Sequence, residues 1–171
     1  MTGPTATLTI RPLTEADADA VAAMSRQFNL YLKDLGDSDP YRFSRERYLA
    51  DGFGADPAFG GLLALVGDAP AGYLLHCPSY DVDLAQRQLM VIDLWVDPTI
   101  RGHGIGRKLM QAAADHASSI KASRLIWAVL RGNQLAADFY RGLGAADIDT
   151  LDWMTLDLPV TLDRPVKIAS R

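Results

Sequence analysis

The stretch that decides the fold is QLMVIDLWVDPTIRGHGIGRKLMQAAADHASSI, residues 88–120. Its first part is an apolar run that contains one acid, Asp93, and Pro98 then ends the strand because proline lacks the N–H needed for pairing. Three glycines follow at alternate positions, and small or apolar residues then recur at helical spacing up to residue 120. The pattern predicts a buried strand that runs through a glycine-rich turn into an amphipathic helix.

The turn between the predicted strand and helix is suited to binding an anion. Its glycines let backbone N–H groups face inward, and the first amides of a helix have no partner within the helix. The positive end of the helix dipole adds to the attraction, and Arg101, Arg107 and Lys108 bring positive charge. We therefore predict a phosphate-binding site at residues 101–107.

Two common phosphate-binding motifs do not fit the spacing of this turn. A P-loop requires a glycine where Arg107 stands and a serine or threonine where Leu109 stands. A dinucleotide-binding fingerprint requires its third glycine at the position of Arg107 as well. A glycine-rich connection without a ligand is the remaining alternative, although three alternate glycines carry an entropic cost that a plain loop does not need.

Length and composition predict one domain. The chain has 171 residues, 49% of them hydrophobic and 22% charged, enough for one sizeable core, which we place at residues 6–158 with a tail at 159–171. It contains no apolar run of about 18 residues and no basic, apolar N-terminal leader, so we expect a cytoplasmic protein without a membrane partner.

Charge and cysteine content narrow the function classes. A single cysteine, Cys77, excludes an internal disulfide, and three scattered histidines provide no helical pair for a metal, so no metal site is expected. The formal net charge is −4 with dispersed basic residues, which argues against a nucleic-acid partner and is compatible with cationic substrates.

Further strands and helices are expected on both sides of the central unit. In chain order we expect a strand at 8–11, a helix between Thr14 and Gly36, a short helix capped by Ser44, strands at 62–66 and 71–77 joined by a hairpin turn at 67–70, an acidic loop at 78–85, a strand at 125–130, a helix between Asn133 and Gly144, and a last strand at 153–158. The βαβ order predicts a parallel last pair and the hairpin predicts antiparallel pairing, hence an α/β fold with a mixed sheet. The competing class is a doubly wound, all-parallel nucleotide-binding fold.

The glycine turn resembles the Arg-x-x-Gly-x-Gly motif with which the GNAT superfamily of N-acetyltransferases binds the pyrophosphate of acetyl-CoA. Here the motif is Arg101-Gly102-His103-Gly104-Ile105-Gly106. Residues 133–145 are similar to the second signature of the superfamily, in which Asn133 is followed by Tyr140 and then by Gly144-Ala145. The resemblance implies a single-domain acyl-CoA N-acyltransferase (GNAT) fold, in which a mixed, mostly antiparallel sheet is splayed at the cofactor site and flanked by helices.

The same resemblance implies a set of cofactor contacts: Leu94, Trp95 and Val96 through the main chain, then Arg101, Gly102, His103, Gly104, Ile105, Gly106, Arg107, Asn133 and Tyr140. A β-bulge in the central strand would free a backbone N–H to polarise the thioester carbonyl. Tyr140 would protonate the departing thiolate, a role open to a phenol whose pKa is about 10. The alternatives are that Tyr140 is a core aromatic residue and that Asn133 is a helix cap.

Within the superfamily, the chain most resembles the diamine acetyltransferases, the spermidine/spermine and thialysine group. The resembling stretches include Asp51-Gly52-Phe53-Gly54, Tyr80-Asp81, and Asp93 together with the glycine turn. One departure matters: the group usually has Glu-Asp on its central strand, whereas this chain has Ile92-Asp93. The glutamate most often proposed as the general base is therefore missing, and its role cannot be transferred.

Asp93 and Asp81 are the candidate acids for an amine substrate. An aspartate inside an apolar strand is partly desolvated, which raises its pKa, so Asp93 could accept a proton, bind an ammonium, or be a buried acid satisfied by neighbouring amides. Asp81 is a substrate-binding candidate by resemblance, with a solvated loop acid as the alternative.

These features predict an enzyme that moves acetyl from acetyl-CoA to a primary amine of a small molecule by direct attack in a ternary complex. The expected acceptors are diamines, polyamines or lysine-like amino acids, and the chain is expected to form a homodimer. One alternative is acetylation of a peptide lysine or another apolar amine, since Ile92 replaces the acid. The other is an acyl-CoA-binding regulatory module without turnover.

Overall fold

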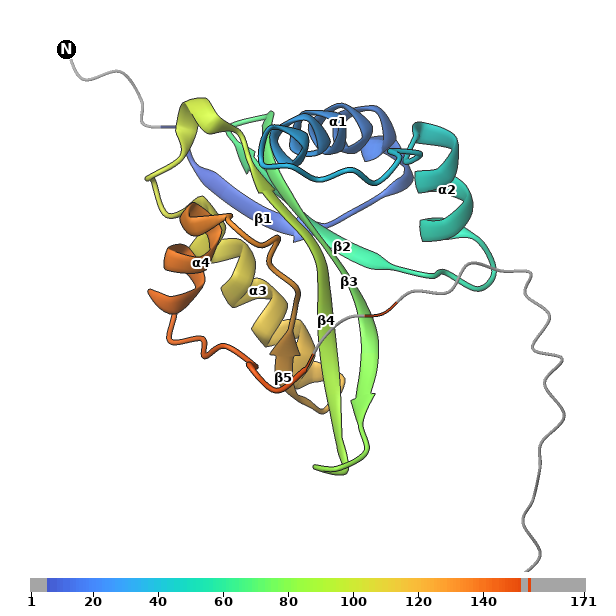
Figure 1. The fold of residues 1–171 in the computed structure, drawn as a ribbon. Helices are drawn as coiled ribbons and strands as arrows, with labels where there is room; N and C mark the ends of the chain where they lie inside the picture. Colours follow the sequence, from blue (N-terminus) through green and yellow to red (C-terminus); the bar gives the residue numbers. More distant parts are fainter. Residues whose placement is uncertain (1–5, 152–153, 155–171) are drawn as a thin grey trace, which may run out of the picture.

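The computed structural model describes residues 6–151 and residue 154 (Figure 1). The main elements are β1 Leu8–Pro12, α1 Ala18–Asp34, α2 Arg45–Phe53, β2 Gly60–Val66, β3 Ala69–Asp81, β4 Gln86–Val96, α3 Ile105–Ser119, β5 Ala122–Ile126 and α4 Gln134–Arg141, with short 3₁₀ turns at Glu15–Asp17 and Pro98–Ile100. The described strands form one sheet in the order β1-β2-β3-β4-β5, antiparallel except for the parallel pair of β4 and β5. The predicted mixed sheet is confirmed, and the doubly wound alternative is wrong.

Helices cover both faces of this sheet, α1 and α2 on one side and α3 and α4 on the other (Figure 1). Successive side chains of β2 point to opposite faces of the sheet, and both faces are apolar. Leu62 and Ala64 pack with α3, while Leu63 packs with α1 and α2. On the second face Tyr73 and Trp95 are also buried. The two cores hold the sheet between two helical layers.

The strands β4 and β5 pair over only part of their length. Their ladder runs from Arg87 to Met90 on β4, whereas β4 itself continues to Val96. The predicted strand at 125–130 is wrong in its bounds, because β5 ends at Ile126 and the next four residues leave the sheet. The sheet is therefore splayed on one side of the second half of β4.

A bulge lies on β4 at the start of the splayed region. Leu75 pairs with Asp93 while the next residue, His76, pairs with Val91, so Ile92 is an extra residue on β4. A bulge of this kind bends the strand and re-aims the side chains beside it. Ile92 and Asp93 consequently both face hollows in the protein.

Two expected loops are shorter than predicted. The predicted acidic loop at 78–85 is wrong, because β3 continues to Asp81 and only the next four residues form the turn. Pro78 is tolerated there because β2 pairs with β3 only as far as His76, which leaves that edge of β3 without a ladder among the described strands. In the first hairpin the turn is Gly67-Asp68, with Gly67 at φ +61°, and β3 begins at Ala69.

Apart from residue 154, the predicted last strand at 153–158 and the tail at 159–171 lie outside the described residues. The homodimer, which the resemblance to the diamine acetyltransferases implies, stays a prediction.

An ion pair fixes the corner between β1 and the first helical turn. The Arg11 guanidinium donates two hydrogen bonds to the Asp17 carboxylate at 2.7 and 2.8 Å, and the backbone N–H of Thr14 donates a third at 2.8 Å. These hydrogen bonds, above all those from Arg11, lower the pKa of the Asp17 carboxyl to about 2. The charged form of Asp17 therefore stabilises the fold.

We expect Asp17→Asn to lower the free energy of unfolding by about 2 kcal/mol at pH 7, the free-energy equivalent of the pKa shift. Because the folded pKa lies below the ordinary value of 3.8, the stabilisation is essentially complete above about pH 5 and is lost progressively as the pH falls through 2. Urea unfolding at several pH values would measure it. Asp19→Asn is the control, since Asp19 is 85% exposed in its ion pair with Arg45; equal losses in both variants would contradict the prediction.

Candidate active site

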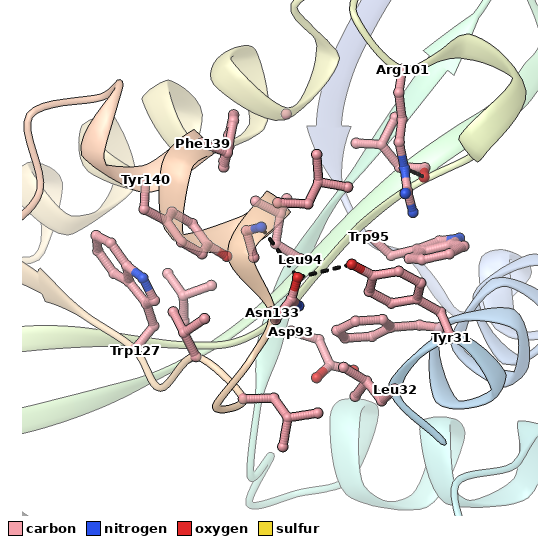
Figure 2. A pocket seen from close by; sticks show the side chains of 18 of the residues that line it. Tyr31, Leu32, Asp93, Leu94, Trp95, Arg101, Trp127, Asn133, Phe139 and Tyr140 are labelled. Atoms are coloured by element: carbon pink, nitrogen blue, oxygen red, sulfur yellow. Dashed lines mark hydrogen bonds between the residues drawn. The ribbon is translucent and has the colours of Figure 1, made fainter. Parts of the chain in front are cut away.

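A cleft of about 490 Å³ lies where β4 and β5 separate. Its walls are the second half of β4, the glycine turn with the start of α3, the segment 127–130, one side of α4, and α1 (Figure 2). It gathers nearly all of the predicted cofactor-binding residues: Leu94, Trp95, Val96, Arg101, Gly102, Gly104, Ile105, Gly106, Arg107, Asn133 and Tyr140. The two sequence motifs thus meet in one place although about thirty residues separate them.

The glycine turn has the geometry expected of an anion site. Gly102 and Gly104 have φ of +82° and +80°, values that other residues rarely adopt, and Gly104 is the N-cap of α3. A Cβ at either position would meet nothing within 4 Å, so the backbone conformation and not crowding requires glycine. Gly106 differs, because a Cβ there would lie 3.2 Å from the ring of Phe139. Free amides of the first turn of α3 border the cleft.

Arg101, His103 and Arg107 of the turn have partners within the protein. Arg101 lies over the rings of Trp95 and Tyr31, at 4.4 and 5.4 Å from their centroids, and its Nε donates to the carbonyl of Val96. Arg107 lines the cleft and donates to the carbonyl of Gly142. His103 does not line the cleft; its Nδ1 lies 3.0 Å from the carbonyl oxygen of Arg101. The cleft is thus positively charged at its α3 end.

Tyr140 stands on α4 with its hydroxyl directed into the cleft (Figure 2). Its ring packs against Trp127 at a centroid distance of 4.8 Å. Burial, and secondarily the charge of Asp93, raises the pKa of Tyr140 to about 12. The phenol is therefore protonated at neutral pH and can donate a proton into the cleft.

Asn133 joins the two walls of the cleft. Its side-chain oxygen accepts the backbone N–H of Ala136, which caps α4, and also the hydroxyl of Tyr31 from α1 at 2.8 Å (Figure 2). The cap was predicted and is confirmed. Tyr31 was not anticipated, because it lies 102 residues away in sequence and nothing local distinguishes it from the other residues of α1.

Asp93 lies beside the bulge and accepts a hydrogen bond of 3.1 Å from the hydroxyl of Tyr73. Burial raises the pKa of Asp93, and the bond from Tyr73 opposes this rise. Tyr73 was missed as well, since a tyrosine in an apolar strand is ordinarily a core residue. Asp93 is thus a partly desolvated acid that faces the cleft.

Asp81 is not brought to the cleft. Its carboxylate accepts hydrogen bonds from the side chain of Gln88 at 2.9 Å and from the backbone of Leu84, and it pairs with Arg124 at 3.4 Å. These contacts place it at the closed end of the β3–β4 hairpin (Figure 1). In the described part of the chain, no three His, Cys, Asp or Glu side chains are grouped so as to hold a metal ion.

Comparison with known proteins identifies the family. The profile of the "Acetyltransferase (GNAT) family" matches residues 24–145, which include the whole cleft region from β4 to α4. The chain belongs to this family. It is therefore an N-acetyltransferase with an α/β fold of the GNAT type, and acetyl-CoA is the co-substrate that GNAT enzymes use.

Curated relatives confirm the likeness to the thialysine group. The chain is 35% identical to thialysine N-epsilon-acetyltransferase of Bos taurus over 147 residues, 81% of this chain and 84% of that protein. It is 32% identical to the Mus musculus protein of the same name over 155 residues, 85% of this chain and 89% of that one.

A solved structure supports the fold. Ribosomal-protein-alanine N-acetyltransferase from Brucella melitensis superposes with a TM-score of 0.68 at 21% identity, over 88% of this chain and 100% of that one. No helix in the described part of this GNAT chain has the length and hydropathy to cross a membrane.

We expect Asn133→Ala to lower the free energy of unfolding by about 1 to 2 kcal/mol, because it removes both a helix cap and the acceptor of Tyr31. Tyr31→Phe should cost less, and the double variant should fall short of the sum by about 1 kcal/mol. Urea unfolding of the four proteins measures this coupling. Gln134→Ala, which removes only a bond to Asp138 on the exposed side of α4, is the control, and strict additivity would contradict the prediction.

Proposed function

We propose that this enzyme transfers acetyl from acetyl-CoA to a primary amine of a small molecule, which is a diamine, a polyamine or a lysine-like amino acid. The observation that carries the proposal is that a protonated phenol, Tyr140, and a partly desolvated acid, Asp93, face one cleft whose far end is an anion site. Acetyl transfer needs all three: a site for the diphosphate, a proton acceptor for the amine and a proton donor for the thiolate.

The cleft suits acetyl-CoA along its length. The amides of the glycine turn, with Arg107 beside them, match the charge of a diphosphate. From Val91 to Val96, β4 has no β5 partner, so its backbone groups on that side are available to the amides of the pantetheine arm. The lining there is largely apolar, with Leu94 and Trp127 among its residues, as a thioester requires.

Asp93 and Tyr140 divide the proton transfers between them. An aliphatic amine has a pKa of about 10.4 and arrives as a cation, which a carboxylate attracts and can deprotonate. The free amine then attacks the thioester carbonyl carbon; the C–N bond forms, the C–S bond breaks, and the sulfur leaves with the bonding electron pair. The nitrogen loses two protons in all: Asp93 takes the first from the ammonium and passes it to solvent, and it takes the second from the nitrogen once the C–N bond has formed. Tyr140 gives its proton to the sulfur and recovers one from the proton that Asp93 holds, so that one proton is released to solvent per turnover. The products are an amide and free CoA.

The relatives' names support a lysine-like acceptor. The cattle and mouse relatives are thialysine N-epsilon-acetyltransferases, and thialysine carries a terminal primary amine. Ile92 favours the second candidate, a peptide lysine or other apolar amine, because it is 46% exposed where the diamine branch usually has glutamate. A regulatory module without turnover is separated from both by thiol release on mixing acetyl-CoA with a panel of amines.

We expect Tyr140→Phe to lower kcat by about ten- to a thousandfold while acetyl-CoA affinity changes little, because water can replace a general acid only partly. Gly104→Val should instead weaken acetyl-CoA binding and change kcat little. Its φ of +80° and the approach of a diphosphate both oppose a side chain at this position. Steady-state kinetics and calorimetric titration with CoA separate the two effects. Equal loss of CoA binding in both variants would mean that Tyr140 is structural.

We expect Asp93→Asn to abolish activity or to move the pH–rate profile to higher pH, because the amine must then lose its proton to water. In the parent enzyme, activity should rise with pH as Asp93 deprotonates, at a pH above the ordinary range of an aspartate. Tyr73→Phe is the matched variant, because it removes the hydrogen bond that lowers the pKa of Asp93. The acid limb of its pH–rate profile should therefore move further to higher pH, while the maximal rate stays unchanged. Profiles that coincide for all three proteins would rule out Asp93 as the base.

A further inference from the structure

A second hollow, of about 430 Å³, meets the cleft at Asp93. It lies between α1, the segment 39–43, the end of α2 and the strands β3 and β4. Both hollows are lined by Phe28, Leu32, Ile92 and Asp93. A molecule in the second hollow therefore reaches the proposed base along walls that do not include the glycine turn.

The second hollow changes character from its floor to its rim. At the floor, Ser25 and Leu75 are 4% and 3% exposed, and Leu75 pairs with Asp93 in the sheet. The rim carries Asp39 and Arg42, both exposed, and the half-buried Asp51. Apolar side chains lie on the walls: Phe28, Leu32, Phe43, Phe59 and Ile92. The hollow thus offers an acid at its depth, an apolar passage, and charges of both signs at its mouth.

The rim charges are poorly matched by the protein itself. Within the described residues, the side chain of Arg42 has neither a hydrogen bond nor an ion pair, and the carboxylate of Asp39 has none either. Among the same described residues, the carboxylate of Asp51 has only a contact of 4.0 Å to Arg47, one helical turn away. In the same hollow, the hydroxyl of Tyr41 is buried without a partner among these residues. The rim thus leaves a guanidinium and two carboxylates for a polar ligand.

We propose that this rim binds the zwitterionic head of an α-amino acid, with Arg42 on the α-carboxylate and Asp51, assisted by Asp39, on the α-ammonium. The side chain of the substrate then runs along the apolar walls, and its terminal amine reaches Asp93. The inference rests on the proposed function and makes its acceptor specific. A diamine or polyamine carries only positive charge, so Arg42 opposes its second ammonium, whereas a lysine-like amino acid satisfies both signs.

Matched substrates test the inference directly. Lysine and cadaverine differ by the α-carboxylate, as do ornithine and putrescine, and Nα-acetyl-lysine keeps the carboxylate but loses the α-ammonium. We expect the parent enzyme to prefer each amino acid over its diamine. Arg42→Gln should lower kcat/KM for lysine about tenfold, mostly through KM, while kcat/KM for cadaverine is unchanged or rises.

Asp51→Asn should lower kcat/KM for lysine by a similar factor and leave Nα-acetyl-lysine unaffected. Arg26→Gln and Asp56→Asn are the controls, because they remove the same charges from exposed positions that line neither hollow. The readout is thiol release at fixed acetyl-CoA, with circular dichroism to establish folding.

Equal losses for lysine and cadaverine in Arg42→Gln, or a parent enzyme that prefers the diamines, would overturn the inference and leave the acetyltransferase proposal standing. Absence of turnover with every amine would instead overturn the proposed function. Calorimetric titration of the parent and Arg42→Gln proteins with lysine and cadaverine would then decide the inference on binding alone: lysine binding that depends on Arg42 supports it, and lysine binding indifferent to Arg42 refutes it.

Discussion

The early end of the parallel ladder between β4 and β5 is the constraint on which the rest of the site depends. Beyond Met90, β4 has no β5 neighbour, and its unpaired backbone would be costly if it were buried without partners. The cleft leaves these groups accessible, and the segment 127–130 and α4 form its opposite wall. Without that separation, the glycine turn and Tyr140 would border a closed sheet with no room for a substrate.

The bulge at Ile92 works together with this separation. An extra residue on β4 shifts the register against β3, so that two consecutive residues, Ile92 and Asp93, both line the hollows. Tyr73 supplies the hydrogen bond that a partly buried carboxylate needs. The acid is thereby held at the junction of two spaces, one long and positively charged at its end, the other bounded by charges of both signs.

Helix α1 contributes more than cover for the sheet. Its buried side packs on Tyr73 and Trp95, while Phe28 and Leu32 form part of both hollows and Tyr31 binds Asn133 across the cleft. One helix thus contributes side chains to the core and to both hollows. The proposed function requires such an arrangement, because it brings two separate spaces to one acid.

Local sequence determined the parts of this protein that depend on neighbouring residues: the strand, glycine turn and helix of residues 88–120, the caps at Ser44 and Asn133, and the hairpin. These follow from backbone preferences and periodicity, which act over a few residues. Only the tertiary structure decided the partners of Asp93, the placement of Asp81 away from the cleft, and the second hollow with Arg42 at its rim. Those features arise where segments far apart in the chain pack together, so no short-range pattern encodes them.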